Sequence, residues 1–177
     1  MTYSKNTEGT RLALRWLWGC LLGLLAATAA RAQLQIEITG ATAQRTPIAI
    51  APFAGEGALG ANGVTGIVRA DLERSGLFRA LELPPLNPVP TDATSVNYSE
   101  WRSRLADALV VGSVSSRPDG RFEVRFRLHD VVKQANLGGI AYTLTKEQFR
   151  ATAHRIADFV YEKLTGDKGV FSTRIAY

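Results

Sequence analysis

Alternation of apolar and polar residues is clearest from residue 122 to residue 129, where it predicts a strand with one buried side. Just before it, residues 108–115 form a continuous apolar run, which is typical of a central strand buried on both faces. Residues 117–120, Arg-Pro-Asp-Gly, join the two runs with strong turn chemistry. We expect Phe122, Val124, Phe126 and Leu128 to point inward, and Glu123, Arg125, Arg127 and His129 to face solvent.

Two stretches have the period of an amphipathic helix. The later helix follows Thr145 and Gln148, which have the spacing of a capping box, and Gly166 is placed to end it in the left-handed conformation. The earlier helix ends at Gly76. The expected buried positions are Val64, Ile67, Val68 and Leu72 in the first helix, and Phe149, Ala153, Ile156, Val160 and Leu164 in the second.

Shorter signals predict the remaining elements. Strands are expected at residues 33–39, 48–53, 78–83 and 140–144, with linkers or loops at 40–46, 55–63, 84–90 and 138–139. Ser99 can cap a short helix that buries Trp101, Leu105 and Ala108. The order of elements predicts an α/β (α+β) fold, in which a mixed sheet of about five strands carries two main helices on one face.

The first 32 residues read as a secretory signal peptide. A basic start precedes a largely apolar stretch from residue 12 to residue 30, and Ala30-Arg31-Ala32 has the small-x-small form that signal peptidase cuts before Gln33. An uncleaved anchor of about 20 apolar residues is the alternative. The cleavage motif favours export, and we expect no stable membrane insertion of the mature chain.

The one cysteine of the sequence, Cys20, lies within this leader. Residues 17–20 resemble a lipobox, but nine mostly apolar residues follow the cysteine, which favours an ordinary signal core. The mature chain would then contain no disulfide, no cysteine metal site and no cysteine nucleophile.

The charge of the chain is less basic than its total of +5 indicates. Four of the 21 basic and one of the 16 acidic residues belong to the leader, which leaves 17 and 15 and a net charge of +2. No basic run exceeds two residues, and aromatic and basic residues do not interleave. Nucleic acid is therefore not expected as a partner.

Several segments resemble the TolB family, the periplasmic component of the Tol-Pal envelope system. Residues 153–158, 161–166 and 171–177 are similar to the junction between the two TolB domains, and residues 47–53, 101–114 and 127–139 fit the amino-terminal domain. The resemblance implies a small α/β domain, similar in fold to some anticodon-binding domains, before a six-bladed β-propeller. We expect a cleaved signal at 1–32, a TolB-like domain at 33–168, and at 169–177 an extended start of a propeller whose remainder is missing.

The resemblance also implies a function. TolB proteins are non-catalytic interaction proteins of the Tol-Pal system, which supports outer-membrane integrity and envelope invagination during cell division. Their residues just after signal cleavage contact TolA, and the matching positions are Gln33, Leu34, Gln35 and Ile36. This segment can be donated to a partner by β-augmentation or can be an ordinary first strand, and the two are not exclusive. The lipoprotein Pal binds mainly on the TolB propeller, so these residues give no basis for Pal binding.

A second interpretation starts from the glycine-rich loop. Residues 55–60 match G-x-G-x-x-G, which would make the chain a periplasmic ligand- or nucleotide-binding domain or an enzyme. Pro52 and Phe53 stand before the glycines, helical periodicity begins only at Val64, and no second βαβ half follows. A connector is therefore the favoured interpretation.

The two histidines offer little chemistry. His129 is expected on the solvent side of its strand, and His154 can bond Asp158 one helical turn later. Neither belongs to a set of three or four zinc ligands, and no nucleophile elbow is present. We predict no catalytic residue, no metal and no cofactor, and we interpret the arginines of residues 121–129 as solvated, with a docking face as the alternative.

Overall fold

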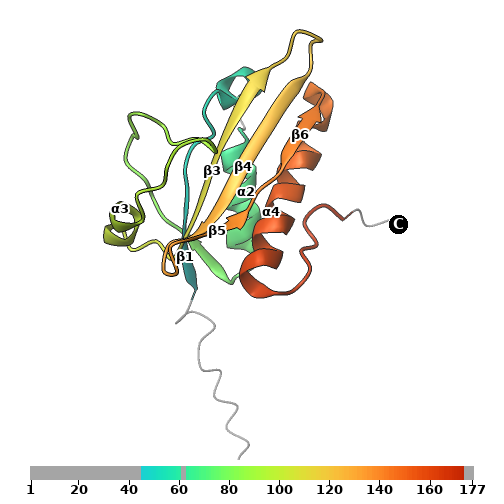
Figure 1. The fold of residues 1–177 in the computed structure, drawn as a ribbon. Helices are drawn as coiled ribbons and strands as arrows, with labels where there is room; N and C mark the ends of the chain where they lie inside the picture. The colour runs from blue at the N-terminus through green and yellow to red at the C-terminus, as the bar shows by residue number, and fades with distance from the viewer. Residues whose placement is uncertain (1–44, 61–62, 174–177) are drawn as a thin grey trace, which may run out of the picture. The chain divides into compact units, whose positions relative to one another are not determined.

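The computed structural model describes residues 45–60 and 63–173, and every structural statement below concerns these residues. They form a mixed β-sheet with helices on both of its faces (Figure 1). The strands are β1 (Thr46–Ile50), β2 (Phe78–Ala80), β3 (Ala108–Ser116), β4 (Phe122–Asp130), β5 (Ala135–Gly138) and β6 (Ala141–Leu144). The helices are α2 (Val64–Arg74), α3 (Tyr98–Ser103), α4 (Phe149–Thr165) and the 3-10 turns η1 (Glu56–Leu59) and η2 (Lys146–Gln148).

The strand order is β2-β1-β3-β4-β5, and β6 also pairs with β4. The strand β1 runs parallel to β2 and β3, whereas β4 is antiparallel to β3, β5 and β6. The strands β5 and β6 extend along one edge of β4, separated by Gly139 and Ile140. A Cβ on Gly139 would collide with the Phe126 carbonyl, so this interruption depends on glycine. The mixed α+β sheet is confirmed, but it has six described strands, and β5 was not predicted.

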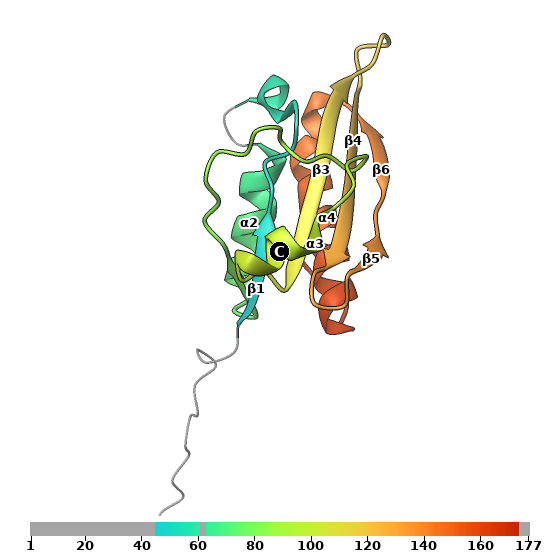
Figure 2. The same ribbon diagram turned by 60° about the vertical axis from the view of Figure 1, so that its left-hand side comes forward.

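The two long helices lie side by side on one face of the sheet (Figure 2). Their apolar faces and the inward side of β4 share one core, with Phe126 2% exposed and Ile156 fully buried. The predicted helix ends hold, since the capping box at Thr145 and Gln148 forms and Gly166 adopts φ +84°. The residues predicted to be buried on the two helices are buried, except that Ile67, Phe149 and Leu164 are only half-buried.

The other face of the sheet carries α3 and the proline-rich segment before it. Trp101 packs there against Leu109, Val111 and Val131, which makes β3 a strand buried on both faces, as predicted. The cap of α3 is Asn97 rather than Ser99, because the Asn97 Oδ1 accepts from the Glu100 backbone N–H at 3.4 Å.

Two burial predictions around α3 were wrong. Leu105 is 72% exposed rather than buried, because α3 ends at Ser103 and the chain turns through φ +62° at Leu105 to enter β3, where Ala108 is buried as predicted. His129 is only 6% exposed rather than solvent-facing, because α3 covers this end of β4.

The residues after α4 were predicted to be extended, and their described part is not. From Gly169 to Thr173 the chain turns back along α4. The Asp158 carboxylate accepts from the backbone N–H groups of Phe171 at 2.7 Å and Ser172 at 3.0 Å. The Phe171 ring packs edge-on against Tyr161. Residues 174–177 lie outside the described part.

Element lengths also differ from the predictions. The strands β1 and β2 end at Ile50 and Ala80, short of residues 53 and 83, and β6 begins at Ala141. The loop at 55–63 contains the turn η1. The predicted strand at 33–39 lies outside the described residues.

Candidate functional site

The predicted partner-binding residues, Gln33, Leu34, Gln35 and Ile36, and the cleavage site between Ala32 and Gln33, lie outside the described residues. The described chain begins at Arg45, directly before β1. Eight residues lie between Ile36 and Arg45, so the chain that joins the predicted site to the start of β1 can span at most roughly 30 Å.

The sheet end at which β1 starts exposes several large apolar side chains. Leu77 precedes β2, Leu105 precedes β3 and Val132 follows β4, so strand direction places all three at this end. Their exposed fractions are 46%, 72% and 52%. Exposed apolar side chains gathered at one end of a domain are typical of contact surfaces.

The glycine-rich loop is fixed by backbone and carboxylate contacts. Gly55 adopts φ +80°, and a Cβ there would collide with the Val114 carbonyl. The Glu56 Oε2 accepts from the backbone N–H and the hydroxyl of Thr65, both at 3.0 Å, in the first turn of α2. A phosphate would need the same helix N-terminus. The chain's own carboxylate thus occupies the place that the nucleotide-binding interpretation requires.

A hollow of ≈ 480 Å³ lies between α2 and α4 on the side facing away from the sheet. At its floor is Asp71, 2% exposed, whose two carboxylate oxygens contact the His154 Nδ1 at 2.5 Å and the Arg74 guanidinium at 3.0 Å. The lining residues are Glu56, Gly63, Thr65, Gly66, Ile67, Ala70, Asp71, Arg74, Arg150 and His154.

The predicted bond between His154 and Asp158 does not form. His154 is bonded to Asp71 of the other helix, and Asp158 binds the turn after α4. Sequence reasoning missed the Asp71–His154 pair because 83 residues separate them and only the packing of α2 against α4 brings them together.

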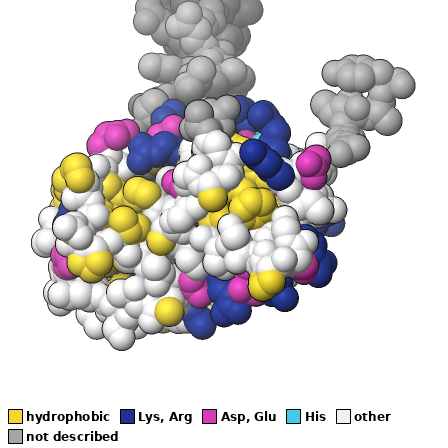
Figure 3. Space-filling view, turned by 90° about the horizontal axis from the view of Figure 1, so that it is seen from above, with side chains coloured by type: hydrophobic (Ala, Val, Ile, Leu, Met, Phe, Trp, Pro, Cys, Tyr) yellow, Lys and Arg dark blue, Asp and Glu magenta, His cyan; other side chains and the backbone are white. Residues whose placement is uncertain are grey.

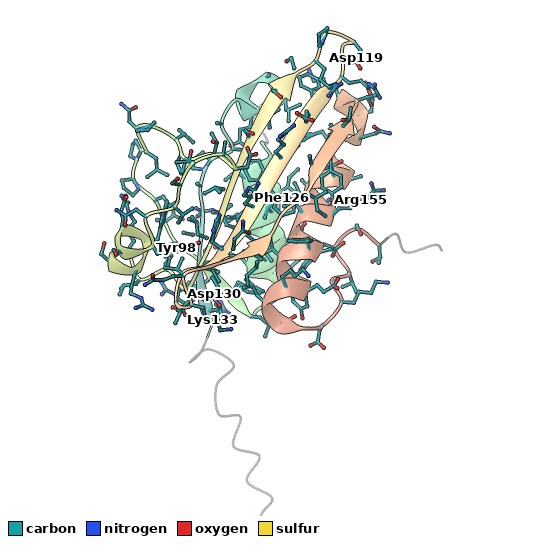
Figure 4. The ribbon with its side chains drawn as sticks, in the orientation of Figure 1. Tyr98, Asp119, Phe126, Asp130, Lys133 and Arg155 are labelled. Carbon is teal, nitrogen blue, oxygen red and sulfur yellow. The ribbon has the colours of Figure 1, made fainter. Side chains whose placement is uncertain are left out.

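His129 joins α3 to β4. The Tyr98 hydroxyl lies 3.0 Å from its Nδ1, and Tyr98 lies beside the end of β4 near Asp130 (Figure 4). The Nε2 atom is the one buried side-chain polar atom of the described residues that lacks a hydrogen-bond partner. Burial, and secondarily the charge of Arg127, lower the pKa of His129. The residue thus fastens α3 as a neutral imidazole.

Three arginines of the β3–β4 hairpin, Arg117, Arg121 and Arg125, pair with acids of the same hairpin. Arg121 contacts Asp119 at 2.7 Å and Arg125 contacts Glu123 at 2.9 Å, and Figure 3 shows basic and acidic side chains intermixed on this end. The hydrogen bond from Arg121 lowers the pKa of Asp119, and that from Arg125 lowers the pKa of Glu123. These pairs are typical of a solvated surface.

Residues 45–60 and 63–173 contain neither a cluster of metal-ligating side chains nor a membrane-spanning helix. This part of the chain contains no group of three or more His, Cys, Asp or Glu side chains that could hold a metal ion. It also contains no helix with the length and apolar character needed to cross a membrane.

Comparison with known proteins gives consistent matches. Residues 34–137 match the family model of the TolB amino-terminal domain. Two curated relatives are each called Tol-Pal system protein TolB. The one from Polaromonas naphthalenivorans is 51% identical over 155 residues, which are 88% of this chain and 35% of the relative. The one from Dechloromonas aromatica is 53% identical over 156 residues, 88% of this chain and 36% of the relative.

A solved structure agrees with the fold. The crystal structure of TolB from Acinetobacter baumannii aligns with a TM-score of 0.61 at 33% identity, over 73% of this chain and 30% of that one. The chain spans about a third of the length of the curated relatives it matches.

Proposed function

Because this chain belongs to the TolB family, whose amino-terminal domain it matches over residues 34–137, we propose that it is a periplasmic component of the Tol-Pal system that acts by docking rather than catalysis. In this role it supports outer-membrane integrity and envelope invagination during division. The observation that carries the proposal is the match with curated TolB proteins over 88% of the chain. Its layout would be a cleaved leader at 1–32, the domain at 33–168 and the start of a propeller at 169–177.

The partner in this proposal is a TolA-like inner-membrane protein, and its site is Gln33 to Ile36. The segment alternates, with Leu34 and Ile36 on one side and Gln33 and Gln35 on the other. Such a strand can add to the edge of a partner's sheet, with backbone hydrogen bonds giving affinity and the apolar side chains giving specificity. It would leave the domain at the sheet end that exposes Leu105 and Val132.

A binding experiment with the TolA periplasmic domain tests this site. Deleting residues 33–36 should abolish capture of TolA by the chain. Gln35→Pro should also weaken binding, because proline removes one backbone donor, whereas Gln35→Ser keeps that donor and should bind normally. Binding that survives the deletion would remove the assignment. Equal binding by the proline and serine variants would exclude strand addition with Gln35 as a donor.

The export step has its own measurement. Mass spectrometry of the chain recovered from the periplasm should give an amino terminus at Gln33, with the leader removed. An amino terminus at Met1 or at a lipidated Cys20 would contradict the proposed cleavage.

The rival function is a ligand- or nucleotide-binding domain that uses Gly55 to Gly60. The Glu56–Thr65 contacts oppose it, because a phosphate would have to displace a carboxylate from the start of α2. The rival predicts that ATP raises the melting temperature by mass action and that Gly57→Val abolishes the rise. We expect no rise.

A further inference from the structure

The hollow between α2 and α4 is separate from the proposed TolA-binding strand. We propose that it is a docking groove for an acidic peptide segment of another protein, whose backbone crosses α2 at Gly66 and whose carboxylate meets Arg150 and His154. Four observations carry this proposal: the direction of the two helices, the position of Arg150, the fixed orientation of His154 and the presence of a glycine in the first turn of α2.

The two helices present their N-termini at the same end of the sheet. The strands β1 and β6 run in the same direction, since β3 is parallel to β1 and β4 is antiparallel to both β3 and β6. The helices α2 and α4 follow these strands and both return along the sheet (Figure 1). The partial positive charges of two helix N-termini therefore lie together, which favours an anionic group nearby.

Arg150 adds a full charge to this end. It is exposed in the first turn of α4, where a cation is disfavoured by the helix dipole, and α4 has no acidic residue in that turn. No acidic side chain of the described residues lies within ion-pair distance of it. Glu56, at the far side of the hollow, is engaged by Thr65. Arg150 is thus the cation of this hollow that still lacks an anion.

His154 lies one turn after Arg150 and is held by Asp71. A carboxylate only accepts, so Nδ1 donates to Asp71 and fixes the ring, and Nε2 can donate to a peptide carboxylate in the imidazolium form, in which both ring nitrogens carry a hydrogen. Arg74 shares the same carboxylate yet keeps 72% of its side chain exposed. These two groups and Arg150 line one hollow from two different helices.

Gly66 points to a peptide rather than to a free anion. Glycine inside a helix is unfavourable, and the described structure gives no reason for it here, because its φ is not left-handed and a Cβ would meet no atom within 4 Å. Together with Ala70 it leaves the outer surface of α2 bare beside the charged groups. Because Gly66 has no side chain and lies in open space, another polypeptide backbone can approach α2 closely at this point. This favours a peptide as the occupant of the hollow.

The test is an NMR titration of the isotopically labelled chain with two capped peptides, Ala-Glu-Ala-Glu-Ala and its glutamine counterpart. The glutamate peptide should shift the amide signals of Gly66, Ala70, Arg150 and His154 saturably, and the glutamine peptide should not. Equal shifts with both peptides, shifts confined to another surface, or the same shifts with sodium acetate alone would each overturn the proposal.

Variants locate the contacts. Arg150→Gln should weaken binding about tenfold, the size expected for one lost charge-assisted hydrogen bond. Gly66→Leu should weaken it at least as much by filling the groove, and the amide spectrum reports whether this variant is folded. The matched control is Arg155→Gln, an exposed arginine of α4 that lies outside this hollow. Unchanged affinity in a folded Arg150→Gln variant would overturn the assignment of this cation.

Discussion

The two faces of the sheet are covered in different ways. One carries α2 and α4, two amphipathic helices whose apolar stripes merge with the sheet in one core that includes Phe126 and Ile156. The other carries the single short helix α3 and an irregular proline-rich segment, fastened by Trp101 and by the Tyr98–His129 pair. The first covering depends on repeated apolar spacing, and the second depends on a few individual contacts. The difference predicts that the α3 face loses less stability than the helix face when one large side chain is removed.

The largest expected effect is the loss of a core aromatic. Phe126→Ala should lower the free energy of unfolding by about 3–5 kcal/mol, because Phe126 packs against Phe159 and Tyr142 in the closed helix-side core. Trp101→Ala should cost about 3 kcal/mol, at the lower end of that range, since its surroundings are a loop and the Arg104 side chain that can move inward. Urea denaturation measures both. A larger loss for Trp101→Ala would reverse the ranking of the two faces.

The helix face is also easier to predict from the sequence than the α3 face. The capping box, Gly166 and the alternation of β4 are local patterns, and they are enough to predict α4 and β4 from the order of residues alone. His129 continues the polar side of that alternation, yet it is buried, because α3 returns over it from 31 residues earlier. The alternation of residues along β4 cannot show that a helix from elsewhere in the chain covers one of its polar positions.

The two candidate sites also differ in how far they could be predicted from the sequence. Gln33 to Ile36 were identified by family resemblance, and the described residues do not reach them. The groove could not be seen in the sequence, because Asp71 and His154 are 83 residues apart and neither carries a recognisable motif. The strand β5 was missed because Ala135 to Gly138 is short, with a single large apolar side chain.

Removal of the polar contacts that hold the helices on each face should have the next largest effect on stability. Asp71→Ala removes the acceptor shared by His154 and Arg74 and leaves two helices without their bridge, so we expect a loss of about 1–3 kcal/mol. Tyr98→Phe removes one hydrogen bond between α3 and His129 and should cost about 1 kcal/mol. Thermal unfolding of both variants checks the order. An equal or greater loss for Tyr98→Phe would mean that α3 is the more strongly fastened covering.

The pH dependence of stability should come in part from the α3 face. The pKa of His129 is lowered in the folded protein, so its contribution is complete above the unfolded value of about 6.5 and is lost as the pH falls below it, because the unfolded chain then binds the proton more readily. Denaturant unfolding between pH 7.5 and pH 5 should show this decline. In His129→Asn, which keeps a bonding group beside Tyr98 but does not ionise, the decline should be smaller. An identical decline in both proteins would assign the pH dependence to other groups.

The smallest expected effect has the opposite sign and lies on the outer surface of the helix face. Gly66→Ala should raise the free energy of unfolding by about 0.5–1 kcal/mol, because alanine is the better helix former and its Cβ meets nothing within 4 Å. Gly112→Ala is the contrasting variant, since its Cβ would collide with the Phe53 ring and the Arg125 carbonyl, and it should destabilise. Chemical denaturation distinguishes the signs. A stabilised Gly66→Ala protein would mean that this glycine is retained at a cost to folding, as a site of close backbone approach requires, whereas a destabilised one would reveal a structural need for glycine within α2 itself.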